Sequence, residues 1–398
     1  MNSSFDKTMN RYILSNALVV LPGRTVDGSV VVEGERIAEV VPNRRFAEGY
    51  DLGGQFLAPG IIDIHTDYLE KEIRPRPSAE IPLGMAFHTM DLRAIACGLT
   101  TVLGAARISG DHDGRTTGWR GDGLKLARAY QTLRRTALAR HLIHVRWNPN
   151  FEPVENILAE VLQLDSIGNI VYNDSLPGER QFRDVEEQIR KLAARQGISE
   201  EEARERFEVR RQAALNVNNR MQVKAAVEGK IPLGSHDDTT VEHVLEAHAS
   251  GATLSEMPCS IEAARKAKEL GMMVCMGAPN YFRGGSHCGN LSCPDAMAEG
   301  LVDILCSDFH FPSLLGSAVK MMRAGMTPSD ALNMMSLNPA RYLRLDHDLG
   351  SIEEGKKADL IAFSAREDFA VVTGVWVEGR ERMRTGMVLQ QRDEAAVA

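Results

Sequence analysis

The stretch PGIIDIHTDYLE, residues 59–70, reads as a buried strand that ends in polar side chains. Its apolar residues form a short continuous run, which is typical of a strand covered on both faces. His65 and Asp67 are two residues apart, so their side chains point to the same face of the strand and can converge on one point. An imidazole and a carboxylate that converge in this way suit a metal ion. The stretch therefore predicts a strand whose carboxyl end carries part of a metal site.

Seven further apolar runs follow this strand, and most of them precede a stretch with helical spacing. Eight such runs between residue 60 and about residue 346 are the number expected of a (β/α)8 barrel, an α/β fold of the TIM type. Most of the runs end in His, Asp or Asn or are followed directly by one of them, and in this fold the carboxyl ends of the strands form the active-site face. The runs are IIDIHTD (61–67), LTTVLGAA (99–106), HLIHVRW (141–147), NIVYND (169–174), IPLGSHDD (231–238), ATLSEMP (252–258), MMVCMGAP (272–279) and VDILCSD (302–308).

The two ends of the chain predict a second, smaller unit. Residues 1–59 contain short strand-like runs with glycines at the turns, and residues 347–398 return to this pattern. We therefore expect a small composite β domain built from 1–59 and 347–398, with a catalytic barrel of residues 60–346 inserted between the two parts. One connection inside the barrel, from about residue 184 to residue 229, is unusually long and reads as charged helices.

Composition excludes several classes of function. The chain has 398 residues, 43% of them hydrophobic, which is enough for a large core, and a formal net charge of −8, which argues against general nucleic-acid binding. No run approaches the roughly 20 apolar residues of a membrane span. The six cysteines are scattered without a zinc-ribbon or disulfide-like pattern. We therefore expect a cytoplasmic protein with no nucleic-acid or membrane partner, and the sequence leaves a homo-oligomer open.

Four side chains at the ends of different predicted strands form the main candidate site: His65, Asp67, His236 and Asp308. A single His or Asp at a strand end is more often structural, but four of them at corresponding ends favour a shared site. Such ligands suit zinc or a similar divalent ion, which lowers the pKa of bound water to about 7. Asp308 follows an apolar strand in a position suited to accepting a proton from that water.

Three further segments gather cationic side chains that would suit an anion. GAPNYFRGGSHCGN (277–290) follows the seventh predicted strand; its glycines let backbone amides approach an anion, and Arg283 offers a fork of donors. A merely flexible loop is the alternative interpretation of this segment. Arg180 follows a Pro-Gly turn in LPGERQF. The third group, Lys71, Arg74 and Arg76, follows the first predicted strand, and together these segments could gather a polyphosphate despite the acidic total.

These motifs, taken in their order along the chain, resemble the amidohydrolase superfamily, and within it the PhnM-type diphosphatases of the bacterial carbon–phosphorus lyase pathway. The resemblance covers nearly the whole chain. The matching segments are LAPGIIDIHTDYLEKEIRPRP, ACGLTTVL, PGERQF, SHDDTT, MGAPNYFRGGSHCGN, SDFHFPSLL, NPAR and EGKKADL.

The resemblance implies hydrolysis of alpha-D-ribose 1-methylphosphonate 5-triphosphate, or a related small phosphorylated compound, with release of pyrophosphate. It implies a divalent metal, zinc or manganese, near His65, Asp67, His236 and Asp308, with Asp308 and His236 taking part in catalysis. It also implies a set of substrate contacts. These residues are Arg76, Arg180, Asp237, Arg283, Gly284, Gly285 and His287.

Three positions depart from the family pattern. The resemblance places a bridging Glu at the end of the fourth strand, where this chain reads HVRWN with Asn148. Histidines are expected at Ser175, after the fifth strand, and at Met90. A neutral amide does not bridge two cations and a serine hydroxyl is a poor zinc ligand, so we expect one ion rather than two. His144, Glu152 and Asp174 are the neighbours that could compensate.

Two other functions stay open at this point. A cyclic-amide or amide hydrolase would share the barrel and the activated water without needing several phosphate-directed arginines, and the fold does not decide between these reactions. A degenerate homologue that binds a phosphorylated ligand without turnover is favoured by Asn148 and Ser175.

Overall fold

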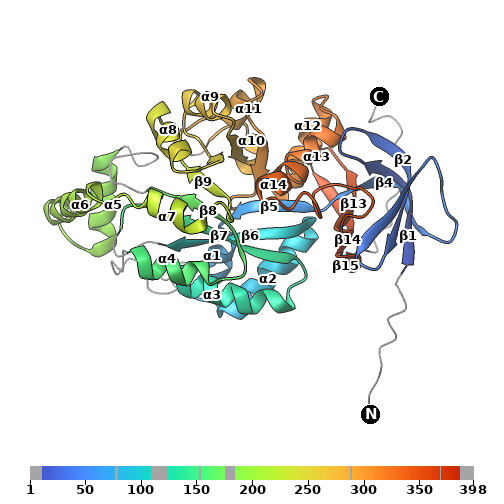
Figure 1. Cartoon of the computed structure of the whole chain (residues 1–398), viewed down its shortest axis with the longest axis horizontal. Helices are drawn as coiled ribbons and strands as arrows, with labels where there is room; N and C mark the ends of the chain where they lie inside the picture. The colour runs from blue at the N-terminus through green and yellow to red at the C-terminus, as the bar shows by residue number, and fades with distance from the viewer. Residues whose placement is uncertain are drawn as a thin grey trace, which may run out of the picture.

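The structure is a computed structural model that describes residues 11–76, 79–108, 123–151, 154–174, 184–286, 289–367 and 369–385. Two sheets organise the chain (Figure 1). A smaller sheet lies at one end of the molecule beside the barrel, and the helices α5 and α6 project at the opposite end. Within the described residues, no helix has both the length and the apolarity to cross a membrane.

Eight parallel strands pair in sequence order to form a nearly closed barrel. A bridge between Thr66 and Asp308 joins the last strand to the first, through bonds from Asp67 N to Asp308 O at 2.7 Å and from Asp308 N to His65 O at 3.1 Å. The predicted (β/α)8 barrel is therefore confirmed. The strands are β5 (Ile61–Thr66), β6 (Leu99–Ile108), β7 (Arg140–Trp147), β8 (Ile167–Tyr172), β9 (Leu233–His236), β10 (Leu254–Glu256), β11 (Met273–Gly277) and β12 (Ile304–Cys306).

Helices connect the barrel strands and bury apolar faces against them. The long connection after β8 is helical, as predicted, and Ser199 caps its second helix by accepting a bond from Glu202 N at 3.1 Å. This connection contains α5 (Val185–Gln196), α6 (Glu200–Leu215) and α7 (Arg220–Val227). The other helices are α1 (Tyr68–Ile73), α2 (Leu83–Ala96), α3 (Gly123–Leu133), the short η2 (Arg134–Thr136), α4 (Val154–Leu162), α8 (Val241–Ala249), α9 (Ile261–Glu269), α10 (Ala278–Arg283), α11 (Cys293–Ala298), α12 (Pro312–Arg323), α13 (Pro328–Asn333) and α14 (Leu337–Tyr342).

Both ends of the chain build the smaller, mixed sheet, in the order β15-β14-β13-β4-β1-β2-β3. Its N-terminal and C-terminal parts meet where β4 pairs with β13, for example at Leu57 and Ala362. The predicted β unit from both termini is thus present, and its boundaries at 59/60 and 346/347 stay a prediction. The strands are β1 (Arg11–Val20), β2 (Thr25–Glu33), β3 (Arg36–Pro42), β4 (Tyr50–Pro59), β13 (Leu360–Ala365), β14 (Ala370–Val377) and β15 (Arg380–Arg384).

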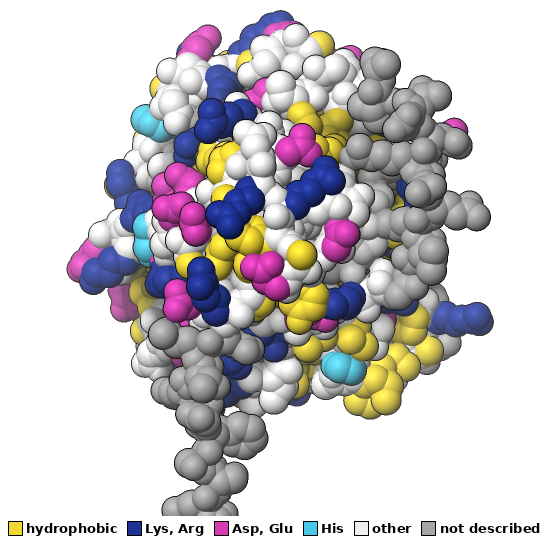
Figure 2. Space-filling view, turned by 90° about the vertical axis from the view of Figure 1, so that its right-hand side faces the viewer, with side chains coloured by type: hydrophobic (Ala, Val, Ile, Leu, Met, Phe, Trp, Pro, Cys, Tyr) yellow, Lys and Arg dark blue, Asp and Glu magenta, His cyan; other side chains and the backbone are white. Residues whose placement is uncertain are grey.

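A group of ion pairs joins the barrel to this sheet. Arg140, at the start of β7, donates to Asp359 at 2.6 Å and to Glu378 at 2.9 Å, and Lys357 donates to the same Glu378 at 2.7 Å. The side chains of Arg140 and Asp359 are only 18% and 5% exposed. Burial would raise the pKa of Glu378, but the bonds from Lys357 and Arg140 lower it to about 2. Figure 2 looks onto this end of the molecule, where cationic and acidic side chains are interspersed.

We expect Arg140→Met to lower the free energy of unfolding by roughly 3 kcal/mol, because Asp359 is then buried without its cation. The matched control is Arg128→Met, which breaks an exposed ion pair with Glu160 and should cost less than about 1 kcal/mol. Urea unfolding followed by circular dichroism compares the two variants.

The stability difference between wild type and Arg140→Met should depend on pH. The depressed pKa of Glu378 stabilises the folded state fully above its ordinary value of 4.5, and this contribution is lost as the pH falls toward about 2. The gap in unfolding free energy should therefore narrow below about pH 4.5. Equal losses in Arg140→Met and Arg128→Met at neutral pH would contradict the assignment.

Candidate metal centre

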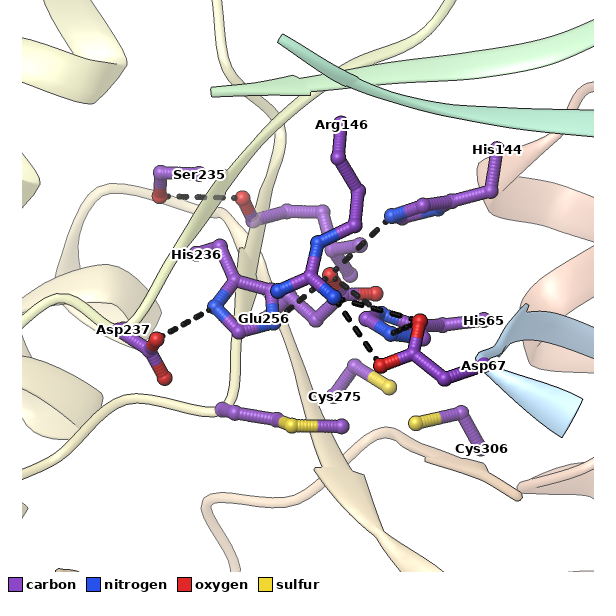
Figure 3. Close-up of polar contacts among 12 residues, drawn as sticks. His65, Asp67, His144, Arg146, Ser235, His236, Asp237, Glu256, Cys275 and Cys306 are labelled. Carbon is purple, nitrogen blue, oxygen red and sulfur yellow. Dashed lines mark hydrogen bonds and ion pairs between the residues drawn. The ribbon is translucent and has the colours of Figure 1, made fainter. Parts of the chain in front are cut away.

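Four buried side chains from four barrel strands meet below the mouth of the barrel: His65 on β5, His144 on β7, His236 on β9 and Glu256 on β10 (Figure 3). Glu256 Oε2 is their common point. It lies 2.9 Å from His65 Nδ1, 3.6 Å from His144 Nε2 and 3.7 Å from His236 Nε2. A fully buried carboxylate is therefore enclosed by three imidazoles.

Charge and burial act in opposite directions in this cluster. Burial would raise the pKa of Glu256, but the charges of His65 and His144 lower it to about 2. Burial would lower the pKa of His65, but Glu256 and Asp67 raise it well above its ordinary value. Burial lowers the pKa of His144 to about 3. The pKa shifts of Glu256 and His65 are therefore those of a buried ion pair, whereas burial dominates at His144.

The donor atoms in the cluster fit a divalent ion. The ring nitrogens of His65 and His144 and both oxygens of Glu256 are buried, and no hydrogen bond of good geometry reaches them from the described residues. Buried polar atoms are ordinarily hydrogen-bonded, so these atoms, which contact one another as ion pairs, suit a shared metal ion. One ligand atom each from His65, His236 and Glu256 lies within 4.8 Å of the other two. Two histidines and one glutamate are a known set for catalytic zinc. We call these three residues the inner set.

A second group, which we call the outer set, contains His65, Asp67 and Asp308, also with ligand atoms within 4.8 Å of one another. It uses the other side of the shared imidazole, because His65 Nε2 faces Asp67 at 3.6 Å whereas Nδ1 faces Glu256. Asp67 already has a cation: Arg146 Nη1 lies 3.1 Å and 3.3 Å from its two carboxylate oxygens. Burial would raise the pKa of Asp67, but Arg146 and His65 lower it far below its ordinary value. Among the described residues, no guanidinium forms an ion pair with Glu256 of the inner set, although Arg146 is near enough to interact with its charge.

The backbone at the strand ends is bent to aim these side chains. Asp237, Met257 and Asp308 follow β9, β10 and β12 and have φ of 60°, 53° and 56°. This left-handed region is uncommon for residues other than glycine and is concentrated at functional sites. Asp237 Oδ2 lies 2.8 Å from His236 Nδ1, which turns Nε2 of that ring toward Glu256. Carboxylates commonly orient metal-binding histidines in this way.

A cavity of about 370 Å³ lies above the cluster. All four predicted ligands, His65, Asp67, His236 and Asp308, line it together with the predicted substrate contact Asp237. The sequence-based expectation that distant imidazoles and acids share one pocket is therefore met by the geometry. Their chemical roles stay predictions.

The other predicted contacts are placed differently. Arg76, Arg283, Gly284 and Gly285 are described but are not among the residues that line the cavity. Arg180 and His287 lie outside the described residues. Substrate binding by these six residues thus stays a prediction.

The residues that could compensate for the missing metal ligands lie in different places. His144 belongs to the cluster, whereas Asp174 lies 3.0 Å from Arg220 in a buried ion pair. Glu152 lies outside the described residues. Of the two described candidates, His144 lies among the candidate metal ligands and Asp174 pairs with Arg220 instead.

Asn148 and Ser175 each follow a barrel strand one earlier than the sequence analysis predicted. Asn148 follows β7, which is the third barrel strand and not the fourth, because only β5 and β6 precede it. Its Oδ1 accepts a bond from Asn150 N at 3.0 Å, so the amide serves the local turn. Ser175 follows the fourth strand, β8, not the fifth, and lies outside the described residues. Met90 is fully buried in α2, where Tyr130 contacts its sulfur.

The sequence analysis missed Glu256 and Arg146. Glu256 ends the run ATLSEMP, so the strand-end rule that selected His236 would also have selected it. Arg146 follows His144 by two residues, which is the spacing that drew attention to His65 and Asp67. Both signals were present in the sequence.

Metal content tests the inner set. We expect the purified protein to hold one tightly bound zinc or manganese ion, and Glu256→Gln to weaken zinc affinity by at least about 100-fold, since it removes a ligand charge but little volume. Free zinc at about 100 times its Kd should stabilise the wild type by about 2.7 kcal/mol. Mass spectrometry of bound metal and chelator competition measure both, with the exposed Glu160→Gln as control. Two tight equivalents, or unchanged affinity in Glu256→Gln, would contradict the assignment.

Comparison with known proteins gives the family. Residues 149–382 match the Amidohydrolase family. The chain is 33% identical over 381 residues to alpha-D-ribose 1-methylphosphonate 5-triphosphate diphosphatase of Escherichia coli (strain K12), covering 92% of this chain and 99% of that protein. Two solved structures share the fold. They are N-acetylglucosamine-6-phosphate deacetylase from Pasteurella multocida (TM-score 0.61, 16% identity, 93% and 99% covered) and dihydropyrimidinase from Brevibacillus agri NCHU1002 (TM-score 0.60, 13% identity, 94% and 95% covered). This chain therefore belongs to the amidohydrolase family.

Proposed function

We propose that this protein is a metal-dependent hydrolase of a phosphoric anhydride. Its substrate is alpha-D-ribose 1-methylphosphonate 5-triphosphate, or a related phosphorylated compound of phosphonate metabolism, and pyrophosphate is released. The observation that carries the proposal is the buried inner set below a cavity that also holds Asp308 and Arg146. The diphosphatase name of a relative with 33% identity, aligned over 99% of its length, supports the choice of substrate.

The inner set would hold one zinc or manganese ion through His65, His236 and Glu256. When bound there, such an ion supplies a Lewis acid and an activated water. A neutral imidazole binds one ion through one nitrogen, and the inner and outer sets present opposite nitrogens of His65. The sharing of this ring supports one ion rather than two. Asn148, whose Oδ1 is used by Asn150 N, adds no bridging charge.

The side chains around the ion have separate tasks. Asp308 lies at the cavity wall and is the carboxylate placed to accept a proton from the attacking water. Asp237 holds the His236 ring through its Nδ1. Arg146 neutralises Asp67 and keeps its carboxylate from repelling an anionic substrate.

The net negative charge of the cavity wall affects the binding of an anionic substrate. Four carboxylates line the cavity, and the buried Glu256 lies below; the four are Asp67, Glu70, Asp237 and Asp308. Among the described residues, its wall has two Lys or Arg side chains, Lys71 and Arg146. Without a further cation, this excess of carboxylates would repel phosphates. The bound ion is therefore needed for binding an anionic substrate as well as for activating water.

We predict that the zinc-loaded protein converts alpha-D-ribose 1-methylphosphonate 5-triphosphate to pyrophosphate and the monophosphate ester, as followed by phosphorus NMR. Asp308→Asn should lower kcat by about 10²- to 10⁴-fold, because the amide accepts no proton. Since Asp308 is outside the inner set, the variant should keep its zinc. Loss of zinc together with activity would reassign Asp308 as a metal ligand and contradict the inner-set mechanism.

The same experiment separates the alternatives. Hydrolysis of a cyclic amide such as dihydrouracil, without pyrophosphate release from the triphosphate, would replace the proposal with an amide hydrolase. Binding of the triphosphate without any product, with zinc present at one equivalent, would identify a homologue that has lost turnover.

A further inference from the structure

Arg146 offers more donors than its ion pair with Asp67 uses. It lies on β7, its guanidinium reaches the cavity wall beside the metal cluster (Figure 3), and its side chain is 18% exposed. Nη1 donates to Asp67, whereas Nε is buried without a hydrogen-bond acceptor among the described residues. A guanidinium has five N–H groups in a rigid fork. Asp67 therefore anchors Arg146 through Nη1, and among the described residues no acceptor is hydrogen-bonded to Nη2, which leaves that nitrogen for a ligand.

Lys71 is a second cation on the same cavity. It lies on α1, four residues after Asp67, and its Nζ is held 3.4 Å from the carbonyl oxygen of Phe309 and 4.3 Å from the centre of the Phe309 ring. In the part of the chain that the structure describes, no carboxylate lies within ion-pair distance of this Nζ. The loop after β12 thus positions the Lys71 ammonium without neutralising its charge.

The polar side chain of Asn280, on the same wall, is already occupied. Its Nδ2 donates to Leu291 O at 2.9 Å and its Oδ1 accepts from Cys293 N at 2.9 Å. It therefore fixes Leu291, which also lines the cavity, and has little capacity left for a ligand. Arg146 and Lys71 are the Lys and Arg side chains that line the cavity among the described residues.

We propose that Arg146 and Lys71 form an oxyanion-binding pair that holds phosphoryl groups of the substrate, with Arg146 beside the metal cluster and Lys71 nearer the mouth. Arginine matches two phosphate oxygens with its fork, and lysine acts as a point charge. Asp67 is then a positioning residue that fixes the guanidinium. The inference rests on the proposed function for the identity of the substrate, and it commits the site to a polyphosphate or similar polyanion.

Equilibrium binding of inorganic pyrophosphate tests the pair directly. Isothermal titration calorimetry of the zinc-loaded full chain should give a Kd that rises by about ten-fold or more in Arg146→Gln and in Lys71→Gln. Arg146→Lys, which keeps the charge but loses the fork, should fall between wild type and Arg146→Gln. The matched controls are Arg93→Gln and Lys320→Gln, which remove cations from α2 and α12 outside the cavity and should leave the Kd unchanged.

Arg146→Gln also leaves Asp67 without its partner, so folding needs its own control. Arg146→Gln combined with Asp67→Asn removes both charges; its melting temperature and zinc content should match the wild type while pyrophosphate binding stays weak. Wild-type affinity in both Arg146→Gln and Lys71→Gln would overturn the inference. If pyrophosphate binding depends on both residues but the triphosphate is not hydrolysed, the proposed function is refuted and this pair is upheld. If the triphosphate is hydrolysed but pyrophosphate binding is unchanged in both variants, the pair is refuted and the proposed function is upheld.

Discussion

The structure of the site depends on the burial of Glu256 among imidazoles. An isolated ionised carboxylate away from water is unfavourable by several kcal/mol or more, so it needs cationic or metal partners. The register of the barrel sheet supplies them. Glu256 is the direct neighbour of His236 across β10 and β9, and His144 reaches the same point from β7. The backbone register of the barrel therefore places Glu256 beside His236.

One imidazole connects this buried cluster to the cavity. His65 presents Nδ1 to Glu256 and Nε2 to Asp67, so it belongs to both candidate ligand sets. Arg146 then divides the site, because its guanidinium compensates Asp67 and leaves the inner set for a metal. The cavity above them is lined by two cationic side chains, Lys71 and Arg146, and by more carboxylates than cations. In the proposed function, a bound metal ion would strengthen anion binding, because its charge offsets the carboxylates of the cavity wall.

The sequence was sufficient for the barrel, the sheet from both termini and the convergence of four site residues, because each follows from a local pattern. Strand-end His and Asp residues identify one face of a (β/α)8 barrel, and His65 and Asp67 share a face through their spacing. The strand that precedes Asn148 was numbered wrongly, because its number was taken from the family resemblance. Counting the apolar runs along the sequence gives the third strand, as in the structure. Which atoms pair was beyond the sequence: the Arg146–Asp67 ion pair and the use of Asp174 by Arg220 depend on side-chain directions across separate strands.

The position of a bound metal tests this account most directly. Crystals grown with zinc and measured at its absorption edge should show one anomalous peak about 2.0–2.2 Å from His65, His236 and Glu256. A peak between Asp67 and Asp308, with Glu256 remote from it, or no peak within the cluster, would contradict the central role of the buried glutamate.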